Sequence, residues 1–329
     1  MHPTNQLLDR SRQIIAANSW YLGIPRGAGP LPGLPCQYAS SDSAAVVHEL
    51  PEHTVHPGHS CPGQPMDQII LYYPKSKSEA DYLCRLALSK LSTGGRLWLV
   101  GENKGGIKTV PKYFAGLELV ARKLDSAKHC SLFEVIPDKS QTFELADLQI
   151  SRVETAEGLT ICSLPGVFGY GKLDHGTQLL LDHLPKLNGK ILDFGCGSGL
   201  ITASLLAANA SLNMHASDIS FRALQATELT LKSNNLPTAT LWHSDGFNQL
   251  EQRFNHIVSN PPFHEGIKTE YSMTEAFITA ARSRLAKGGS LTIVANTFLK
   301  YEPIFERAFG HCNILAQAKG FKVLQAHNR

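Results

Sequence analysis

Apolar and polar residues follow one another along the second half of the chain in a pattern that predicts strands separated by helices. Five short apolar runs are typical of buried strands: 190–194, 214–219, 240–243, 256–259 and 290–295. Three stretches carry apolar residues at the spacing of a helix face: 200–208, 221–234 and 272–286. A last segment, 320–326, alternates like an edge strand. This order favours an α/β domain with a doubly wound, mostly parallel sheet, in which ligands bind at the carboxyl ends of the strands.

The first half of the chain contains a weaker copy of the same pattern. Three pairs of segments align: 67–74 with 255–262, 91–100 with 285–294, and, in residue type but not in register, 128–135 with 319–324. We therefore expect two tandem Rossmann-like domains of duplicated fold. Chance similarity is the alternative, because a Gly-Gly turn before a strand is common in α/β proteins.

The two copies differ in residues that could carry chemistry. No glycine cluster precedes Tyr72 in the first copy, and Tyr72 stands where the second copy has Asn260. We expect residues 1–150 to form a degenerate domain that kept the scaffold and lost the chemistry. Residues 151–329 would then form the catalytic domain.

Length and composition fit two such domains. A chain of 329 residues with 43% hydrophobic and 18% charged residues is neither disordered nor a small disulfide scaffold. No apolar run approaches the roughly 20 residues of a membrane-spanning helix, and residues 1–12 resemble neither a secretory signal nor a transit peptide. The seven cysteines are scattered without a C-x-x-C pair, which is typical of reduced thiols. We therefore expect a cytoplasmic protein.

A glycine-rich loop follows the first predicted strand of the second half. Asp193 lies near the end of that strand, and Gly195, Gly197 and Gly199 alternate with other residues before a helix begins. Glycines let the backbone approach a ligand closely, and the helix amino terminus faces that ligand. A dinucleotide-binding loop would need a small residue where Leu200 stands. The G-x-G-x-G spacing with its leading acid instead resembles motif I of class I S-adenosylmethionine-dependent methyltransferases.

Two further acids stand at the ends of the next predicted strands. Asp218 comes 25 residues after Asp193, where a carboxylate accepts hydrogen bonds from ribose hydroxyls in nucleoside sites. Asp245, followed by Gly246, stands where the resemblance to methyltransferases implies contact with the adenine edge. Each acid alone is more often a helix cap or a surface residue. Their order after the glycine loop is what indicates a cofactor site.

The fourth predicted strand of the second half ends in Ser-Asn-Pro-Pro-Phe-His at 259–264. This resembles the N-P-P-F/Y motif of methyltransferases that modify planar amide or amine nitrogens. An exocyclic amine conjugated with a ring is a poor nucleophile, because its lone pair is delocalised. Asn260 Oδ1 and the Pro261 carbonyl can each accept one of its hydrogens and direct the lone pair to the methyl donor, while Phe263 stacks on the base. Alone, X-Pro-Pro is more often a rigid loop.

A segment ahead of the glycine loop narrows the resemblance to one group within the methyltransferases. Residues 164–182 begin Leu-Pro-Gly-Val-Phe and pass through Lys-Leu-Asp to a predicted helix. Together with Asn-Pro-Pro-Phe-His-Glu-Gly at 260–266 and with 101–108 in the degenerate copy, they are similar to the bacterial ribosomal RNA guanine-N2 methyltransferases. The resemblance covers both halves. It departs in Cys196, within the glycine loop, and in the Gly-Tyr-Gly that follows Phe168, which leaves the base contacts open.

This resemblance implies methyl transfer from S-adenosylmethionine to the exocyclic N2 of a guanine in 16S rRNA, within the 30S subunit or an assembly intermediate. The enzyme would be a monomer without a metal, acting neither on DNA nor at a membrane. The residues implied to bind the cofactor are Asp193, Gly195, Cys196, Gly197, Gly199, Asp218, Ile219, Asp245, Gly246 and Asn260. Those implied in catalysis are Asn260, Pro261 and Phe263. Those implied to hold the guanine are Phe263, His264, Phe168, Lys172 and Asp174, with His264 expected to bind the base rather than to transfer a proton.

Other functions stay open. A large-subunit (23S) rRNA guanine-N2 methyltransferase would share these motifs. Enzymes that methylate adenine N6 in DNA or protein glutamines also carry N-P-P-F/Y, but the glutamine enzymes favour Tyr at position 263, and neither group is expected to carry a degenerate copy. A non-enzymatic RNA-binding assembly factor is the alternative from another class, against which the retained Asp193, Gly195, Gly197 and Asn260 argue. Affinity for S-adenosylmethionine would separate that factor from an enzyme.

The charge of the first copy suggests a role for it. The net charge of the chain is only +3, but residues 104–128 gather six basic side chains against Glu118 and Asp125. A solvated face is as good an explanation, yet a phosphate-binding surface fits an RNA substrate. We therefore interpret the first copy as an RNA-docking domain that supports the catalytic one. The basic residues are Lys104, Lys108, Lys112, Arg122, Lys123 and Lys128.

One histidine-rich segment has the spacing of a metal site. His53, His56 and His59 with Cys61 lie in a Pro- and Gly-rich stretch and could supply imidazole and thiolate ligands. No second cluster of Cys or His frames them. A polar surface loop is the favoured interpretation.

Overall fold

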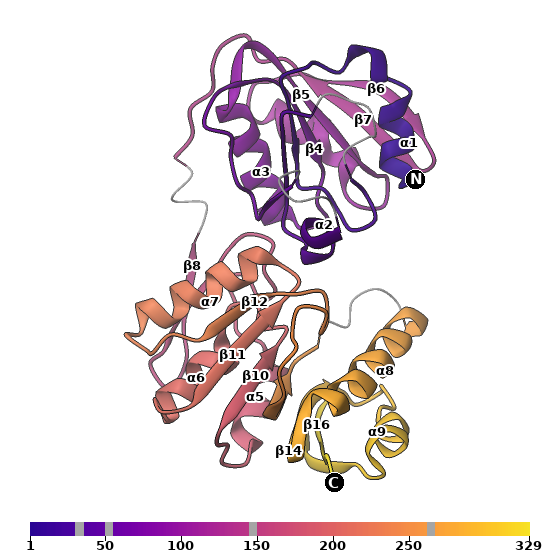
Figure 1. Ribbon diagram of the computed structural model, residues 1–329. Coiled ribbons are helices and arrows are strands. Elements are labelled where there is room, and N and C mark those ends of the chain that lie inside the picture. Colours follow the sequence, from indigo (N-terminus) through magenta and orange to yellow (C-terminus); the bar gives the residue numbers. More distant parts are fainter. Residues whose placement is uncertain (30–35, 50–54, 145–149, 262–266) are drawn as a thin grey trace. The chain divides into compact units, whose positions relative to one another are not determined.

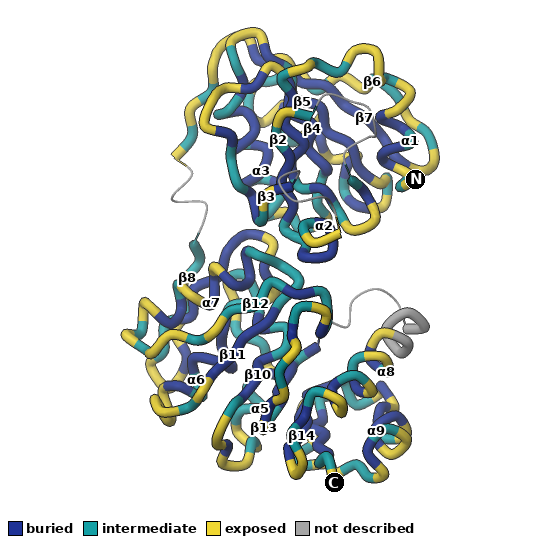
Figure 2. Tube along the Cα trace, viewed as in Figure 1, coloured by how far each residue is buried: buried dark blue, intermediate teal, exposed yellow. Residues whose placement is uncertain are grey.

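The computed structural model describes residues 1–29, 36–49, 55–144, 150–261 and 267–329. It divides into two compact units, Met1–Ile150 and Ser151–Arg329 (Figure 1). Each unit contains a seven-stranded sheet with helices packed on its faces. The central strands of each unit are mostly buried, and the edge strands β6, β12 and β15 are not (Figure 2).

The second unit begins with a short hairpin and continues with alternating helices and strands. Its elements are β8 (Ser151–Glu154), β9 (Thr160–Ser163), α5 (His175–His183), β10 (Lys190–Phe194), α6 (Leu200–Ala208), β11 (Asn213–Asp218), α7 (Phe221–Ser233), β12 (Thr240–His243), β13 (Phe254–Ser259), α8 (Ile267–Arg284), β14 (Leu285–Asn296), α9 (Glu302–Phe309), β15 (Asn313–Ala318) and β16 (Phe321–His327).

The large sheet of this unit has the order β12-β11-β10-β13-β14-β16-β15. Its first five strands are parallel, and β16 runs antiparallel to both β14 and β15. The doubly wound α/β prediction is therefore confirmed. The prediction that 320–326 forms an edge strand is wrong, because β16 is covered on both sides by neighbouring strands and β15 forms the edge.

Neighbouring residues on the strands face opposite layers of helices, as the period of two in a strand requires. Ile191 and Val258 pack in the cluster that contains Leu180, Ile201 and Leu231 from α5, α6 and α7. The adjacent strand residues Leu192 and Ile257 pack in a separate cluster, which also contains Ile278 of α8 and Phe305 of α9. The central strands are therefore buried on both faces, which explains why they read as continuous apolar runs.

The first unit repeats this architecture with shorter helices. Its elements are α1 (Pro3–Asp9), η1 (Arg12–Ile14), β1 (Ser19–Leu22), β2 (Tyr38–Ser41), α2 (Ala44–Glu49), β3 (His56–Pro57), β4 (Met66–Tyr72), α3 (Lys77–Ser89), β5 (Leu91–Glu102), η2 (Ile107–Thr109), α4 (Val110–Ala115), β6 (Ala121–Ala127) and β7 (Cys130–Val135). The strand order β3-β2-β1-β4-β5-β7-β6 matches that of the second unit strand for strand.

An irregularity in the central strands is shared by both units. The β4–β5 ladder shifts register just before Gln68 pairs with Arg96, and the β13–β14 ladder shifts just before His256 pairs with Ser290. A glycine lies inside the later strand at each shift, directly before the residue at which regular pairing resumes. A Cβ on Gly95 would lie 2.9 Å from the Ser92 carbonyl oxygen, and one on Gly289 would lie 2.7 Å from the Asn255 carbonyl oxygen. The Gly-Gly pair is therefore required by backbone packing in both copies, which favours duplication over chance.

The closing hairpins also coincide. Lys128 and Lys319 both occupy the left-handed region, with φ of 50° in each case, and each begins the two-residue turn before the last strand. The prediction that 128–135 and 319–324 differ in register is therefore wrong. β7 and β16 start at equivalent positions.

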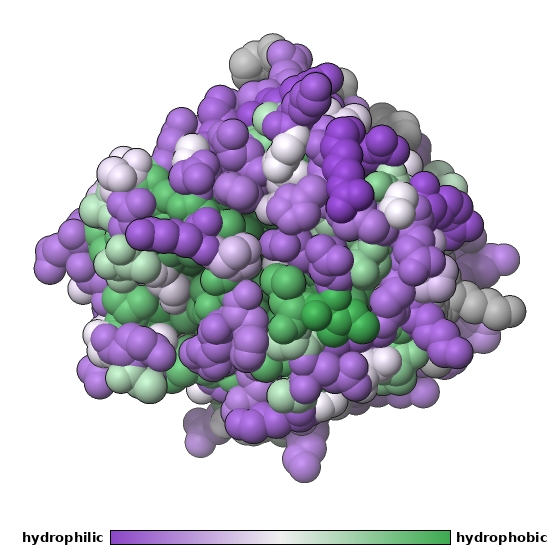
Figure 3. All heavy atoms as spheres, turned by 90° about the horizontal axis from the view of Figure 1, so that it is seen from below, coloured by the Kyte–Doolittle hydropathy of each residue, from purple (hydrophilic) through white to green (hydrophobic). Residues whose placement is uncertain are grey.

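Polar side chains occupy much of the face seen in Figure 3, with apolar side chains gathered between them. Within the described residues, no helix combines the length and the apolar character that crossing a membrane requires. All seven cysteines are free thiols.

Candidate active site

A small hollow opens at the carboxyl ends of the central strands of the second unit. Three parts of the chain line it: the loop and first turn of α5, the glycine loop after β10, and the residue that follows β13. Of the predicted site residues, those at its wall are Phe168, Lys172, Asp174, Gly195, Cys196, Gly197 and Asn260. The hollow lies where a doubly wound sheet binds its ligands.

The three glycines of the loop have different structural roles. Gly195 and Gly197 have positive φ values of 74° and 54°, and a Cβ on either would meet nothing closer than 4.0 Å. Their missing side chains therefore keep the hollow open. A Cβ on Gly199 would instead lie 2.9 Å from Thr227 of α7, so this glycine is needed for the packing of α6 against α7.

Asp193 is fully buried and does not line the hollow. Its Oδ2 accepts hydrogen bonds from Thr202 N (3.1 Å) and Thr202 Oγ1 (2.7 Å), which tie β10 to the first turn of α6. Its Oδ1 has no hydrogen-bond partner among the described residues. Burial raises the pKa of the Asp193 carboxyl to about 7. Asp193 therefore shapes the glycine loop from behind.

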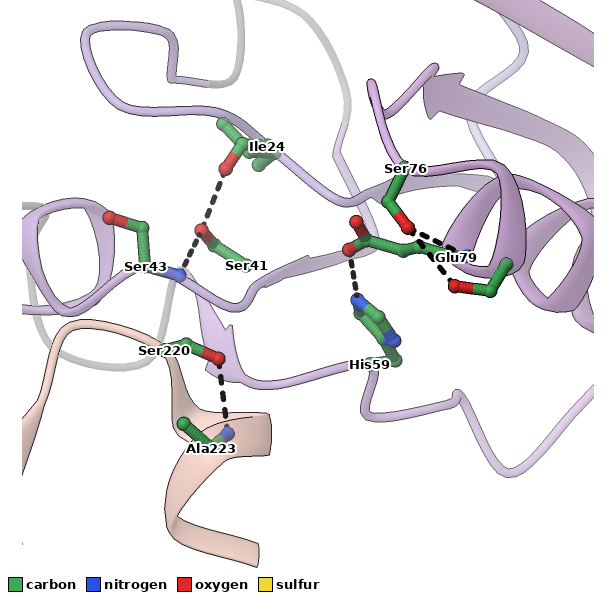
Figure 4. Close-up of polar contacts among 9 residues, drawn as sticks. Ile24, Ser41, Ser43, His59, Ser76, Glu79, Ser220 and Ala223 are labelled. Carbon is green, nitrogen blue, oxygen red and sulfur yellow. Dashed lines mark hydrogen bonds and ion pairs between the residues drawn. The ribbon is translucent and has the colours of Figure 1, made fainter. Parts of the chain in front are cut away.

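Asp218 holds the same loop from the next strand. Its Oδ2 accepts a hydrogen bond from Gly197 N (3.0 Å), and its Oδ1 accepts one from Ser220 N (2.9 Å). Ser220 in turn caps α7 by accepting a hydrogen bond from Ala223 N (3.1 Å; Figure 4). The half-buried carboxylate of Asp218 thus fixes the glycine loop at the carboxyl end of β11.

The third predicted acid lies close to the second. Ser244 N, at the end of β12, donates a hydrogen bond to the Asp218 carbonyl (3.0 Å). Asp245 follows it and is half-buried, and Gly246 has a φ of 61° with open space where a Cβ would stand. Ile219 accepts a hydrogen bond from His243 Nε2 through its carbonyl (3.0 Å). The ends of β11 and β12 therefore form one continuous wall.

Asn260 is bound to the start of α5. Its Nδ2 donates hydrogen bonds to Asp174 Oδ1 (2.7 Å) and Thr177 Oγ1 (2.8 Å). Asp174 Oδ1 also caps α5 by accepting a hydrogen bond from Thr177 N (2.8 Å). Because both amide hydrogens of Asn260 are engaged, the orientation of its amide is fixed and Oδ1 is its remaining polar atom. Pro261 follows and is buried.

Of the other predicted substrate contacts, the structure describes Phe168 and Lys172. Phe263 and His264 lie outside the described residues. Phe168 is 47% exposed and Lys172 is exposed, both on the loop ahead of α5. The Phe168 carbonyl lies 4.0 Å from the position of a Cβ on Gly197. That loop therefore crosses the opening of the glycine loop.

Cys196 is a buried thiol and not a nucleophile. Burial raises its pKa well above the usual value, and the negative charges of Asp218 and Asp193 add to that effect. Thr227 Oγ1 donates a hydrogen bond to its sulfur (3.3 Å). Its place at the wall of the hollow is explained by the close packing of a small side chain under the glycine loop.

Two residues with clear structural roles escaped the sequence analysis. Thr177 positions the Asn260 amide, and Thr202 binds Asp193. The only signal for Thr177 is its place three residues after Asp174 at a helix start, which is the spacing of an N-cap contact. Nothing local points from Thr202 to an acid nine residues earlier.

In the first unit, side chains fill the position that corresponds to the hollow of the second unit. Gly23 N and Ile24 N donate to the Ser40 carbonyl (3.0 and 3.1 Å), as Gly195 N and Cys196 N donate to the carbonyl of the residue before Asp218 (2.8 and 3.0 Å). The first copy therefore keeps the opening turn of the loop, which the sequence analysis missed because Ile-Pro follows the glycine. By this register, the counterparts of Asp193, Asp218 and Asn260 are Tyr21, Ser41 and Tyr72.

Bulky side chains occupy the place in the first unit that corresponds to the hollow. Tyr21 and Tyr72 are buried in one cluster with Leu7 and Leu8 of α1 and with Ile24. Burial raises the pKa of the Tyr72 phenol well above its usual value. The first unit therefore has an apolar core where the second has its hollow.

One histidine of the histidine-rich segment lies next to an acid of α3. His59 Nε2 lies 3.4 Å from Glu79 Oε1 (Figure 4), and Cys61 Sγ donates a hydrogen bond to the His59 carbonyl (3.5 Å). His53 lies outside the described residues. Among the residues that the structure describes, no group of three or more His, Cys, Asp or Glu side chains could hold a metal ion.

Comparison with known proteins assigns the chain to a family. The methyltransferase small domain matches residues 158–325, and the methyltransferase small domain N-terminal family matches residues 37–151. Ribosomal RNA small subunit methyltransferase C of Shewanella pealeana is 43% identical over 274 residues, which cover 82% of this chain and 80% of the relative. The chain belongs to the ribosomal RNA small subunit methyltransferase C family.

Further members of this family agree. The Vibrio cholerae protein of the same name is 41% identical over 263 residues, covering 79% of this chain and 77% of its own. The solved structure of the T. thermophilus 16S rRNA N2 methyltransferase (RsmC) in complex with AdoMet and guanosine covers 100% of this chain and 92% of its own, with a TM-score of 0.82 and 25% identity. Membership in the family confirms the predicted resemblance, the tandem Rossmann-like fold and the assignment as a methyltransferase.

Proposed function

We propose that this chain transfers a methyl group from S-adenosylmethionine to the exocyclic N2 of a guanine in 16S rRNA. The observation that carries the proposal is the Asn260 amide, held by Asp174 and Thr177 at the wall of the glycine-lined hollow. The names of the relatives support the RNA and the subunit, and the AdoMet and guanosine of the T. thermophilus complex support the cofactor and the base.

The residues of the hollow fit the cofactor. Gly195 and Gly197 leave open space at their Cβ positions, and the amino terminus of α6 begins directly behind them. The half-buried carboxylate of Asp218 stands at the adjacent strand end, with Asp245 beside it. These groups would hold the amino-acid part, the ribose and the adenine in that order. The bound cofactor supplies an electrophilic methyl group on a sulfonium.

Asn260 would direct the amine of the guanine. Because its Nδ2 is engaged by Asp174 and Thr177, only Oδ1 can accept a hydrogen from that amine. The Pro261 carbonyl would accept the second hydrogen. Two acceptors in fixed positions would hold the hydrogens out of the plane of the ring, so that the nitrogen becomes pyramidal and its lone pair turns out of conjugation, toward the methyl group. No strong base is needed, because the amine loses its proton after methylation.

The base would be held from both sides of the hollow. Phe263 and His264 are our sequence-based candidates for stacking and for hydrogen bonding, and Phe168 is an exposed aromatic ring at the wall. Lys172, exposed on the same loop, suits a phosphate. A guanine in structured RNA must be unpaired or flipped out to reach these groups.

The first unit would serve RNA docking and not catalysis. Five of its six predicted basic residues form no ion pair with the described residues, and the sixth, Arg122, is 3.2 Å from Glu134. Charge reversal of Lys104 and Lys108 should therefore weaken RNA binding and reduce its salt dependence. Unchanged affinity and an unchanged salt slope would remove this role. We further propose that the chain acts as a monomer in the cytoplasm, where its substrate resides.

The deciding experiment is methyl transfer from labelled S-adenosylmethionine to purified 30S subunits, 50S subunits and protein-free 16S rRNA, followed by nucleoside analysis. We expect N2-methylguanosine in small-subunit RNA and its loss in Asn260→Ala. Comparison of the 30S particle with protein-free 16S rRNA identifies the form of the substrate. Label in 50S RNA, in DNA or in protein glutamine would contradict the proposed substrate while keeping the pocket chemistry.

A further inference from the structure

An exposed aromatic ring stands on a rigid loop beside the candidate active site. The loop 297–301 follows β14, which runs parallel to β13, so it leaves the sheet at the same edge as Asn260. Leu299 and Tyr301 anchor the loop, because both are buried. Phe298 lies ahead of these anchors and is 66% exposed. A single exposed apolar side chain is common on protein surfaces. The place of Phe298 at the sheet end that carries Asn260 is what suits it to contact a ligand there.

A lysine at a strained position borders this loop. Thr297 N donates a hydrogen bond to the carbonyl of Gly320 (2.9 Å), in the turn between β15 and β16. Lys319 precedes it, is exposed and has a φ of 50°. Phe321, the next residue after the turn, packs on the first turn of α5, since a Cβ on Gly176 would lie 3.0 Å from its ring. That turn of α5 also holds the Asn260 amide, so the loop of Phe298 and the turn of Lys319 lie at the same end of the sheet as the hollow.

The acid at the start of α9 does not cancel the charge of Lys319. Glu302 Oε1 lies 2.6 Å from the Nζ of Lys322, whose side chain is only 4% exposed. This ion pair neutralises the carboxylate within the protein. The surface of Phe298 and Lys319 therefore presents an aromatic face and a positive charge.

The first unit retains the same turn between its last two strands, although it lacks the active-site residues. Lys128 is the counterpart of Lys319, with the same φ of 50°, and Asn103 N donates to the His129 carbonyl (2.8 Å) as Thr297 N does to Gly320. Asn or Gly adopts this left-handed conformation more easily than lysine. A lysine kept in both copies at an unfavourable position indicates a role that does not depend on the cofactor.

We propose that Phe298 and Lys319 form a contact surface for single-stranded RNA next to the target guanine. A neighbouring base stacks on Phe298, and Lys319 binds a backbone phosphate. The proposal rests on the proposed function, because it assumes an RNA substrate whose target base enters the adjacent hollow. An aromatic ring beside a cation fits the two recurring parts of a nucleotide, a base and a phosphate.

The test compares Phe298→Ala, Lys319→Asn and the control Lys287→Asn. Asn keeps the left-handed backbone of position 319 and removes only the charge. Lys287 is also exposed and beside a glycine with positive φ, but it lies at the opposite end of β14. Each variant is assayed for S-adenosylmethionine affinity, for binding of protein-free 16S rRNA at several salt concentrations, and for N2-methylguanosine formation.

We expect Phe298→Ala to weaken RNA binding at least about fivefold and to raise KM more than it lowers kcat. Lys319→Asn should reduce the slope of log affinity against log salt by about 0.7, the value for one phosphate of a single strand. Lys287→Asn and the cofactor affinities should stay unchanged.

Three outcomes would overturn the proposal. Normal RNA binding by both Phe298→Ala and Lys319→Asn, with active wild type, removes the surface and leaves the proposed function intact. Normal binding of protein-free rRNA with reduced methylation of 30S subunits assigns the surface to a ribosomal protein instead. Absence of N2-methylguanosine with wild type rejects the proposed function and this surface with it.

Discussion

Asn260 and Asp174 are joined by a hydrogen bond of 2.7 Å from the amide nitrogen to the carboxylate, across 86 residues of sequence. The first unit contains the same link in altered chemistry, because Tyr72 donates to Asn5 Oδ1 over 2.7 Å. Asn5 holds the third position after the N-cap of α1, as Thr177 does in α5. Duplication has thus preserved the tie between strand end and helix start, and only the second copy places an amide there.

Loosening this tie should slow catalysis without emptying the site. In Thr177→Val, Asn260 Nδ2 loses one of its two acceptors, and the amide can rotate. Loss of a hydrogen bond that contributes about 1.4 kcal/mol to positioning lowers kcat about tenfold. Single-turnover rates at saturating cofactor check this. The affinity for S-adenosylmethionine and the melting temperature should change little, and an equal loss in cofactor affinity would assign Thr177 to the pocket itself.

Two glycines of one loop should respond differently to the same substitution. Gly195→Ala places a methyl group in the open hollow, so cofactor affinity should fall while the free energy of unfolding drops by about 1 kcal/mol from the positive φ. Gly199→Ala drives its Cβ to 2.9 Å from Thr227, so stability should fall by about 3 kcal/mol or more. Urea unfolding and calorimetric titration measure both quantities. Equal effects of the two substitutions would contradict this division.

Asp193 predicts a pH dependence of stability. Its folded pKa of about 7 lies above the ordinary 3.8, so the folded state binds this proton more tightly than the unfolded state. Stability from this group is fully present below pH 3.8 and is lost as the pH rises toward 7. Asp193→Asn cannot ionise, so the unfolding free energy of wild type should fall relative to the variant by up to about 1.4 kcal/mol per pH unit in that window. A constant difference across the window would show that Asp193 stays charged.

Each chain should bind a single cofactor. The second unit has an open glycine loop, whereas Tyr21, Tyr72, Leu7 and Leu8 fill the corresponding place in the first. Calorimetric titration with S-adenosylmethionine should give a stoichiometry of one, and Gly195→Ala should weaken that one site. Tyr72→Asn should not create a second site, because the apolar neighbours remain. A stoichiometry of two would contradict the filled core of the first unit.

Local sequence signals predicted most of the fold because they arise from neighbours along the chain. Short continuous apolar runs marked the strands of the second unit, and Gly-Gly pairs marked the register shifts within β5 and β14. The edge-strand prediction for 320–326 failed because alternation along one strand says nothing about its neighbours in the sheet. The opening turn at Gly23 was missed because it is kept by backbone hydrogen bonds to Ser40, which leave no glycine motif behind.

The sequence by itself determined which residues stand at the carboxyl ends of the strands, because the glycine loop, its acids and Asn-Pro-Pro-Phe are each continuous in the chain. Only the tertiary structure decided which contacts each of these residues makes. Asp193 turned inward to Thr202, Asp218 bound the glycine loop, and Asn260 was fixed by Asp174 and Thr177. The physical reason is that such side-chain hydrogen bonds depend on strand order and helix packing, which bring together residues that no local pattern connects.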